Sequence, residues 1–142
     1  MASGLHPTGR LGDADLVPLE RYERVAREMR GLLRRTPESA LHVHIGMPDE
    51  DTAVRVFNEL RRHLPLLVGL SANSPWWFGI DSGLASARWA LTRAYPGRGI
   101  PHGLRDIGDV EERTAATLVV ADAPEATFLW WDLRIHPNYG TV

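Results

Sequence analysis

The sequence lacks cysteine and contains no long apolar run. Without cysteine it can form no disulfide, no zinc–thiolate centre and no thiol nucleophile. No stretch reaches the roughly 20 apolar residues that a membrane-spanning helix needs, and the N-terminus has no signal-peptide core. We therefore expect a cytoplasmic protein that does not act at a membrane.

Excess positive charge is also absent, because the formal net charge is -2. A chain of this charge gives no general attraction to nucleic acid, so nucleic acid is not an expected partner. The basic side chains are arginines, which we attribute to codon usage and not to phosphate binding. Partner recognition must therefore depend on particular residues.

The 142 residues, 44% of them hydrophobic, are enough for a single domain with a core of its own. We predict one domain over residues 1–142. Residues 1–15 are rich in Gly, Pro and small side chains, and they indicate a loosely ordered arm.

Apolar residues recur every three or four positions in several stretches, which is typical of amphipathic helices. Pro65 lies inside one of these stretches, where it predicts a kink or two abutting helices. The four predicted helices cover residues 16–35, about 49–70, 83–95 and 109–121.

Two further segments alternate between apolar and polar residues, as half-buried strands do. Leu41, Val43 and Ile45 form the apolar side of residues 40–46, and residues 128–136 alternate in the same way. Strands separated by helices favour an α/β or α+β fold in which helices cover the apolar strand faces. The opposite faces would carry the polar side chains of His42, His44, Asp132, Arg134 and His136.

His42 and His44 are two residues apart on an extended chain, so their Cβ atoms lie about 7 Å apart on one side. The pair could bind a metal or address two parts of one ligand. It could equally be two polar residues that face solvent. Arg134 could hold a phosphate or carboxylate through its planar guanidinium, or it could pair with Asp132 across the strand face.

Asn73 and Ser74 precede Pro75, where they could present an amide and a hydroxyl to a ligand or simply end a helix. Arg88 could bind an anion or lie on the surface of a helix. The sequence contains no Walker-type phosphate loop, no GxGxxG loop and no local Ser/His/Asp motif.

Four segments, taken in order, resemble the middle of the carboxylate–amine ligase family, close to its glutamate–cysteine ligase members. They are ASGLHP at 2–7, ALHVHIGMPDEDTAVRVFNELRRHLPLLVGLSANSPWWFGIDSGLASAR at 40–88, GIP at 99–101 and ATFLWWDLRIHPNYGTV at 126–142.

This resemblance implies a glutamine-synthetase-like fold, with a curved, largely antiparallel sheet and helices on one face. It implies a reaction in which ATP, with Mg²⁺, phosphorylates a carboxylate such as glutamate. An amine such as cysteine then attacks the acyl phosphate.

Position by position, the resemblance makes His42 a metal ligand and His44 a nucleotide contact. Asn73 and Ser74 become nucleotide-binding residues. It also gives catalytic roles to Arg88, on the substrate side, and to Arg134, which would face phosphate as part of the ATP site.

The sequence also departs from the family pattern. It has no cluster of glutamates such as G-V-E-E-E, and no acidic-x-Arg pair follows Asn138-Tyr139-Gly140. We therefore expect an incomplete site, from the central part of a catalytic domain, with weak or no activity alone. The alternatives are a non-catalytic module or remnant that forms homo-oligomers through exposed sheet edges, and a transition-metal protein using His42, His44 and His136.

Overall fold

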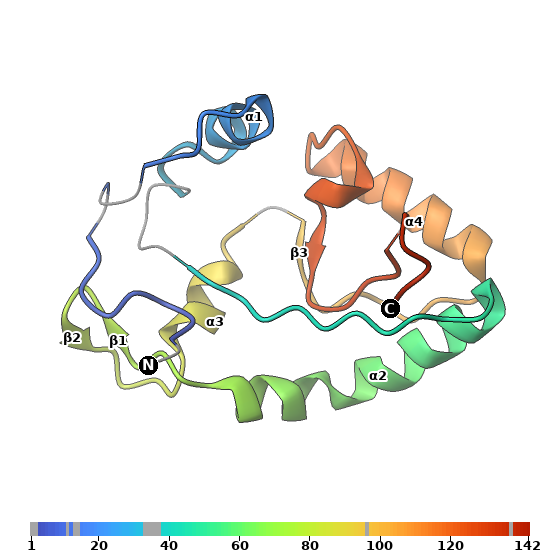
Figure 1. The fold of residues 1–142 in the computed structure, drawn as a ribbon, viewed down its shortest axis with the longest axis horizontal. Coiled ribbons are helices and arrows are strands. Elements are labelled where there is room, and N and C mark those ends of the chain that lie inside the picture. The colour runs from blue at the N-terminus through green and yellow to red at the C-terminus, as the bar shows by residue number, and fades with distance from the viewer. Residues whose placement is uncertain (1–2, 11, 13–14, 33–37, 96, 137) are drawn as a thin grey trace. The chain divides into compact units, whose positions relative to one another are not determined.

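The computed structural model describes residues 3–10, 12, 15–32, 38–95, 97–136 and 138–142. The chain divides into two compact units. The first unit comprises residues 1–41 and 71–95, and the second comprises residues 42–70 and 96–142. Over the described ranges the protein is a mixed α/β structure with four α-helices and two two-stranded sheets (Figure 1).

The first unit contains α1 (Glu20–Met29), which continues as a 3₁₀ turn over Arg30–Leu32. Val25 and Met29 are its buried residues, four positions apart on one helical face. The predicted helix is confirmed with shorter bounds, because Leu19 is still extended. The end of the predicted range, residues 33–35, lies outside the described residues.

The first unit also contains a tight hairpin, in which β1 (Trp76–Trp77) pairs antiparallel with β2 (Ile80–Asp81). Its two turn residues, Phe78 and Gly79, have φ values of 54° and 76°, as a two-residue hairpin turn requires. The helix predicted over 83–95 is α3, which is limited to Ala87–Thr92.

The second unit contains most of α2 (Glu50–Ser71) and all of α4 (Ile107–Val120). Before α2, the carboxylate of Asp49 accepts the Thr52 N–H at 2.7 Å, and this bond lowers the pKa of Asp49. Pro65 does not divide the helix, which is continuous to Ser71. No helix among the described residues is long and apolar enough to cross a membrane.

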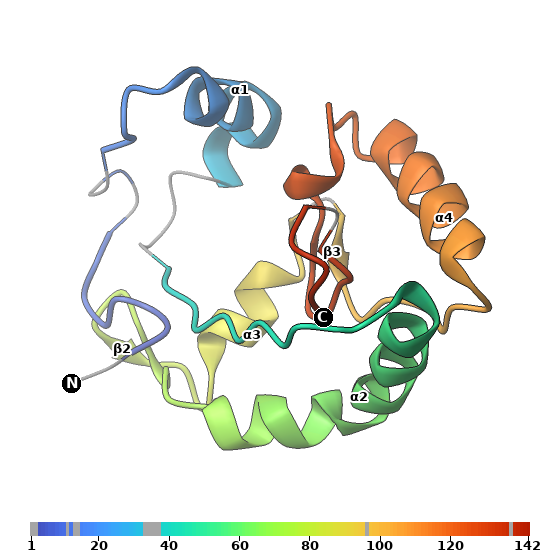
Figure 2. The ribbon, with the colours of Figure 1, turned by 45° about the vertical axis from the view of Figure 1, so that its right-hand side comes forward.

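The remaining sheet joins β3 (Arg98–Gly99) and β4 (Trp130–Trp131) in parallel (Figure 2). The core of the second unit joins α2 to Leu104 and Val142. Its buried members are Ala53, Val54, Phe57, Leu104 and Val142, and Leu133 and Ile135 pack partly buried against them.

Residues 40–46 differ from the half-buried strand that their alternation predicts. The side chains of Leu41, Val43 and Ile45 are 89%, 70% and 45% exposed, so burial of this apolar face was predicted wrongly. The segment is extended but forms only an isolated antiparallel bridge, between Gly46 and Thr141. Within the described residues no second layer covers it, and no curved sheet is present.

Residues 128–136 are also only partly a strand. The named strand is limited to β4, after a 3₁₀ turn over Ala126–Phe128, and His136 forms an isolated antiparallel bridge with Thr141. A bend at residues 132–133 then interrupts the strand, although Leu133 and Ile135 do face the core as predicted.

Candidate functional site

Three extended segments lie side by side at the C-terminal end of the second unit. The backbones of Ile45 and Val142 exchange hydrogen bonds of 2.9 and 3.0 Å, and Met47 donates to the Gly140 carbonyl at 3.0 Å. The chain turns back on itself so that the His136 N–H donates to the Thr141 carbonyl at 2.8 Å. This pairing brings the side chains of residues 44, 136, 139 and 141 together.

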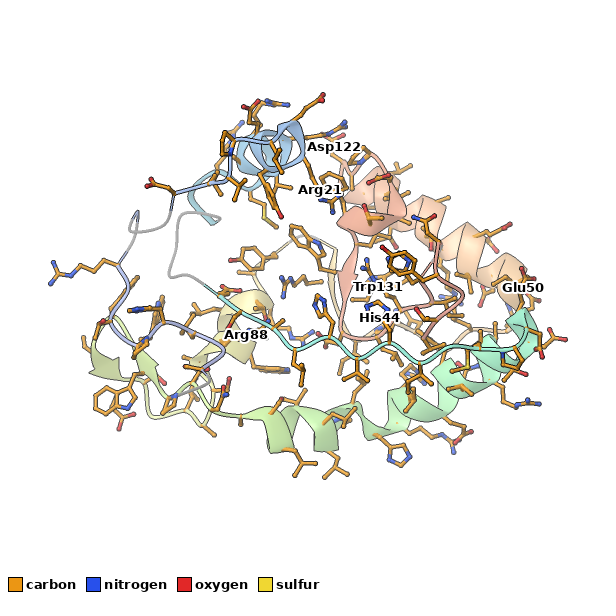
Figure 3. The ribbon with its side chains drawn as sticks, in the orientation of Figure 1. Arg21, His44, Glu50, Arg88, Asp122 and Trp131 are labelled. Atoms are coloured by element: carbon orange, nitrogen blue, oxygen red, sulfur yellow. The ribbon has the colours of Figure 1, made fainter. Side chains whose placement is uncertain are left out.

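We call His44, His136, Tyr139 and Thr141 the histidine cluster. Nδ1 of His44 lies 3.1 Å from the hydroxyl oxygen of Thr141, and its ring centroid lies 5.9 Å from that of His136. The rings of His136 and Tyr139 are stacked, with centroids 4.1 Å apart and planes 9° apart. In Figure 3, His44 projects from its extended segment toward the C-terminal part of the chain.

His136 is held in a single neutral tautomer. Its Nδ1 accepts the Asn138 N–H at 3.2 Å, so the proton of the neutral ring is on Nε2. Burial lowers the pKa of His136, and the charges of Arg134 and His44 lower it further. Nδ1 of this ring uses its lone pair for the Asn138 N–H and Nε2 carries the proton, so neither nitrogen has a free lone pair for a metal. This argues against a transition-metal site built from His42, His44 and His136.

Arg134 reaches this region from the segment that follows β4. Its half-buried guanidinium donates from Nη1 to the Leu129 carbonyl at 3.0 Å, a bond that fixes the direction of the side chain. The proximity of its positive charge to His136 is the second cause of the lowered His136 pKa. Arg134 and His44 therefore both belong to the surroundings of His136.

His42 is exposed on the same extended segment. Among the residues that the structure describes, no three His, Asp or Glu side chains come together as a metal site. The assignment of His42 as a metal ligand stays a prediction.

In the first unit, the predicted residues Asn73, Ser74 and Arg88 come together around Gly4. The Oδ1 atom of Asn73 accepts from the Gly4 N–H at 3.2 Å and from the Ser74 hydroxyl at 3.0 Å. Ser74 is only 2% exposed, and its carbonyl accepts the Ala87 N–H at the start of α3. We call this group the Asn73 cluster.

Arg88 extends from α3 (Figure 3) to the backbone of Gly4. A Cβ atom on Gly4 would lie 2.7 Å from Cδ of Arg88, so any larger residue would require Arg88 to move. The Nε atom of Arg88 is buried and has no hydrogen-bond partner among the described residues. Four further arginines have an Nε atom in the same state, so this feature alone does not mark Arg88 as an anion site.

Sequence reasoning did not single out Gly4, Thr141 or Tyr139 as members of these clusters. All three lie in segments that carry the family resemblance, and this resemblance is the signal that could have identified them. No local pattern identifies them, because Gly4 is 69 residues from Asn73 and His44 is 97 residues from Thr141.

A shallow hollow of about 310 Å³ also lies in the second unit, but no predicted site residue lines it. Its charged lining has both signs, so it does not select one class of ligand. The lining residues are Asp51, Val54, Arg55, Asn58, Glu59, Arg105 and Asp106.

The two clusters and Arg134 thus offer imidazole, guanidinium, amide and hydroxyl groups, with which enzymes hold carboxylates and phosphates. Glutamate-cysteine ligase family 2 (GCS2) matches the chain over residues 1–142, and the chain belongs to this family.

The chain is 40% identical over 144 residues to a glutamate–cysteine ligase of Haloquadratum walsbyi, covering 99% of this chain and 39% of that protein. It is 37% identical to a putative glutamate–cysteine ligase 2 of Thermobifida fusca, covering 99% and 35%. A glutamate–cysteine ligase of Natronomonas pharaonis is 36% identical, with 99% and 39% covered. The chain therefore spans little more than a third of the length of these curated relatives.

Proposed function

We propose that the chain supplies part of an ATP-dependent glutamate–cysteine ligase. ATP phosphorylates a carboxylate, of which glutamate is the candidate, and an amine such as that of cysteine attacks the acyl phosphate. The observation that carries this proposal is the family match over residues 1–142, together with relatives that are named glutamate–cysteine ligases.

In the second unit, we assign nucleotide binding to His44 and Arg134. An imidazole N–H and a guanidinium both donate to phosphate oxygens, and the guanidinium can donate two parallel bonds. The position of both residues near His136 supports this assignment. Arg134 would also stabilise the negative charge that develops as the phosphoryl group is transferred.

In the first unit, we assign ligand binding to the Asn73 cluster. The Asn73 amide and the Ser74 hydroxyl would contact the nucleotide, and Arg88 would act on the substrate carboxylate. The close approach of Arg88 to Gly4, beside Asn73 and Ser74, supports this assignment.

The described residues do not by themselves fit Mg²⁺, which prefers six oxygen ligands that include carboxylates. They gather no group of three His, Asp or Glu side chains. We propose that Mg²⁺ enters with the nucleotide, with His42 beside it, and that its carboxylate ligands come from outside the described residues.

We also propose that the antiparallel pairing between residues 45–47 and 140–142 is one part of a curved, glutamine-synthetase-like sheet. Its support is the alternation of residues 40–46, whose apolar side chains are exposed here. A further layer over these side chains would bury them as the sequence pattern predicts.

The test is titration of the chain with MgATP by isothermal calorimetry. We expect saturable binding, which His44→Ala weakens about tenfold because a hydrogen bond to a charged group is lost. His63→Ala, which removes an exposed histidine of α2, is the matched control and should leave the affinity unchanged. Absence of saturable binding, or equal loss in both variants, would contradict the nucleotide site.

Catalysis is measured separately, as release of ADP from MgATP in the presence of glutamate and cysteine. Activity that equals that of a His42→Ala, Arg134→Ala double variant would contradict a catalytic role for this chain alone.

A second candidate function is a non-catalytic module that self-associates. It is favoured by the exposed apolar side chains of Leu41, Val43 and Ile45, since monomeric proteins rarely leave such rows uncovered. Self-association without any nucleotide-dependent rise in melting temperature would favour the module over the ligase.

A further inference from the structure

Backbone hydrogen bonds fix the position of Thr141 beside His44. Its neighbour Val142 exchanges two backbone hydrogen bonds with Ile45, and its own carbonyl accepts the His136 N–H. These bonds fix both the strand that carries His44 and the strand that carries Thr141. The 3.1 Å approach of the Thr141 hydroxyl to Nδ1 of His44 therefore follows from the pairing of the two segments.

A threonine hydroxyl can act on a neutral imidazole in two ways. If it donates to Nδ1, the ring proton is on Nε2 and the outer edge of His44 is a donor. If it accepts from Nδ1, the outer Nε2 atom has a lone pair and His44 suits a metal ion. The two states bind opposite classes of ligand, so the direction of this one hydrogen bond decides what His44 can do.

We propose that Thr141 is a positioning residue that donates its hydroxyl hydrogen to Nδ1 of His44 and so presents Nε2–H to a phosphate oxygen. The proposal rests on the proposed function for the identity of the ligand. Phosphate oxygens only accept hydrogen bonds, so a neutral histidine that binds them must offer an N–H.

The kind of group that lies at Nδ1 agrees with this direction. Metal-bound histidines usually donate their second N–H to a carboxylate or a backbone carbonyl. The contact that His44 makes at Nδ1 is instead with a hydroxyl, which can donate.

The direct test is ¹⁵N NMR of the full chain at about pH 8, where a free imidazole is neutral. The His44 signals are assigned from their absence in His44→Gln. We expect Nε2 of wild-type His44 to be protonated and Nδ1 to be unprotonated. A proton on Nδ1 would overturn the proposal.

Binding of ADP and of inorganic pyrophosphate gives the second measurement. Thr141→Val keeps the shape of the side chain but removes the hydroxyl, and we expect it to weaken both ligands about tenfold. Thr141→Ser should restore the affinity. Thr117→Val is the control, since that hydroxyl bonds the Arg113 carbonyl within α4.

These outcomes separate this proposal from the proposed function. If wild type binds neither ligand while His44 has the expected tautomer, the phosphate site is wrong and the role of Thr141 in orienting the ring stands. If Thr141→Val binds both ligands as wild type does, the positioning role is overturned. Should Thr141→Val fail to fold, the wild-type spectrum and Thr141→Ser decide.

Discussion

At the scale of single residues, Gly4 is the contact point of the Asn73 cluster. A methyl group in its place would approach Cδ of Arg88 to 2.7 Å and the Ser74 hydroxyl to 3.2 Å. We expect Gly4→Ala to lower the free energy of unfolding by about 1–3 kcal/mol, as overpacking does, because half-buried Arg88 must move. Urea denaturation followed by circular dichroism measures this change.

The control for this variant is Gly46→Ala. A Cβ atom on Gly46 meets nothing within 4 Å, so this substitution should change stability by only a few tenths of a kcal/mol. If both variants lose the same stability, the loss comes from glycine replacement in general and the close approach of Arg88 does not matter.

At the scale of elements, the helices were predictable because their signals are local. The start of α4 shows such a local signal, because the Asp106 carboxylate accepts the Asp109 N–H at 2.8 Å. The helix begins at Ile107, two residues before its predicted start. The burial of residues 40–46 was not predictable, because alternation fixes which side chains share a face but not what covers them. For the same reason, the sequence alone could not place Thr141 against His44.

The N-terminal turn of α4 also carries a charge network centred on Asp109, which is 2% exposed. Its carboxylate accepts from the Arg105 guanidinium at 2.9 Å and from the Arg105 backbone at 3.0 Å, and Nε of Arg113 lies 3.0 Å away. The side-chain hydrogen bond from Arg105 is the main cause that holds the pKa of Asp109 well below its ordinary value of 3.8.

This lowered pKa predicts how α4 responds to acid. The folded state holds the ionised carboxylate more strongly than the unfolded state does, so its contribution to stability is complete above the ordinary pKa. The contribution is lost as the pH falls from there through the folded-state pKa. Asp109→Asn should therefore be less stable than wild type at pH 7, and the difference should shrink when the pH falls below 3.8.

Urea denaturation at pH 7, 4 and 2.5 measures that difference. Glu59→Gln is the control, because Glu59 is exposed and its ion pair with Arg62 has a distance of 3.6 Å, so little change is expected at any pH. A constant difference between wild type and Asp109→Asn across the range would show that the charge of Asp109 is not what stabilises the helix.

At the scale of the whole molecule, the feature that bears on assembly is a row of exposed apolar side chains. The chain corresponds to 35–39% of the length of the curated relatives, and Leu41, Val43 and Ile45 are uncovered in it. We propose that a second copy of the chain covers these side chains, since monomeric proteins rarely leave such apolar rows exposed.

We therefore expect the chain to self-associate, with an average mass that rises with concentration in size-exclusion chromatography coupled to light scattering. Val43→Lys should lower that mass toward the 15.8 kDa of the monomer, because it places a charge in the exposed row. Val119→Lys, at an 82% exposed valine of α4, is the matched control and should associate as wild type does. Equal dissociation by both variants would indicate general solubilisation and not an interface at residues 41–45, and a monomeric wild type would exclude the self-associating module.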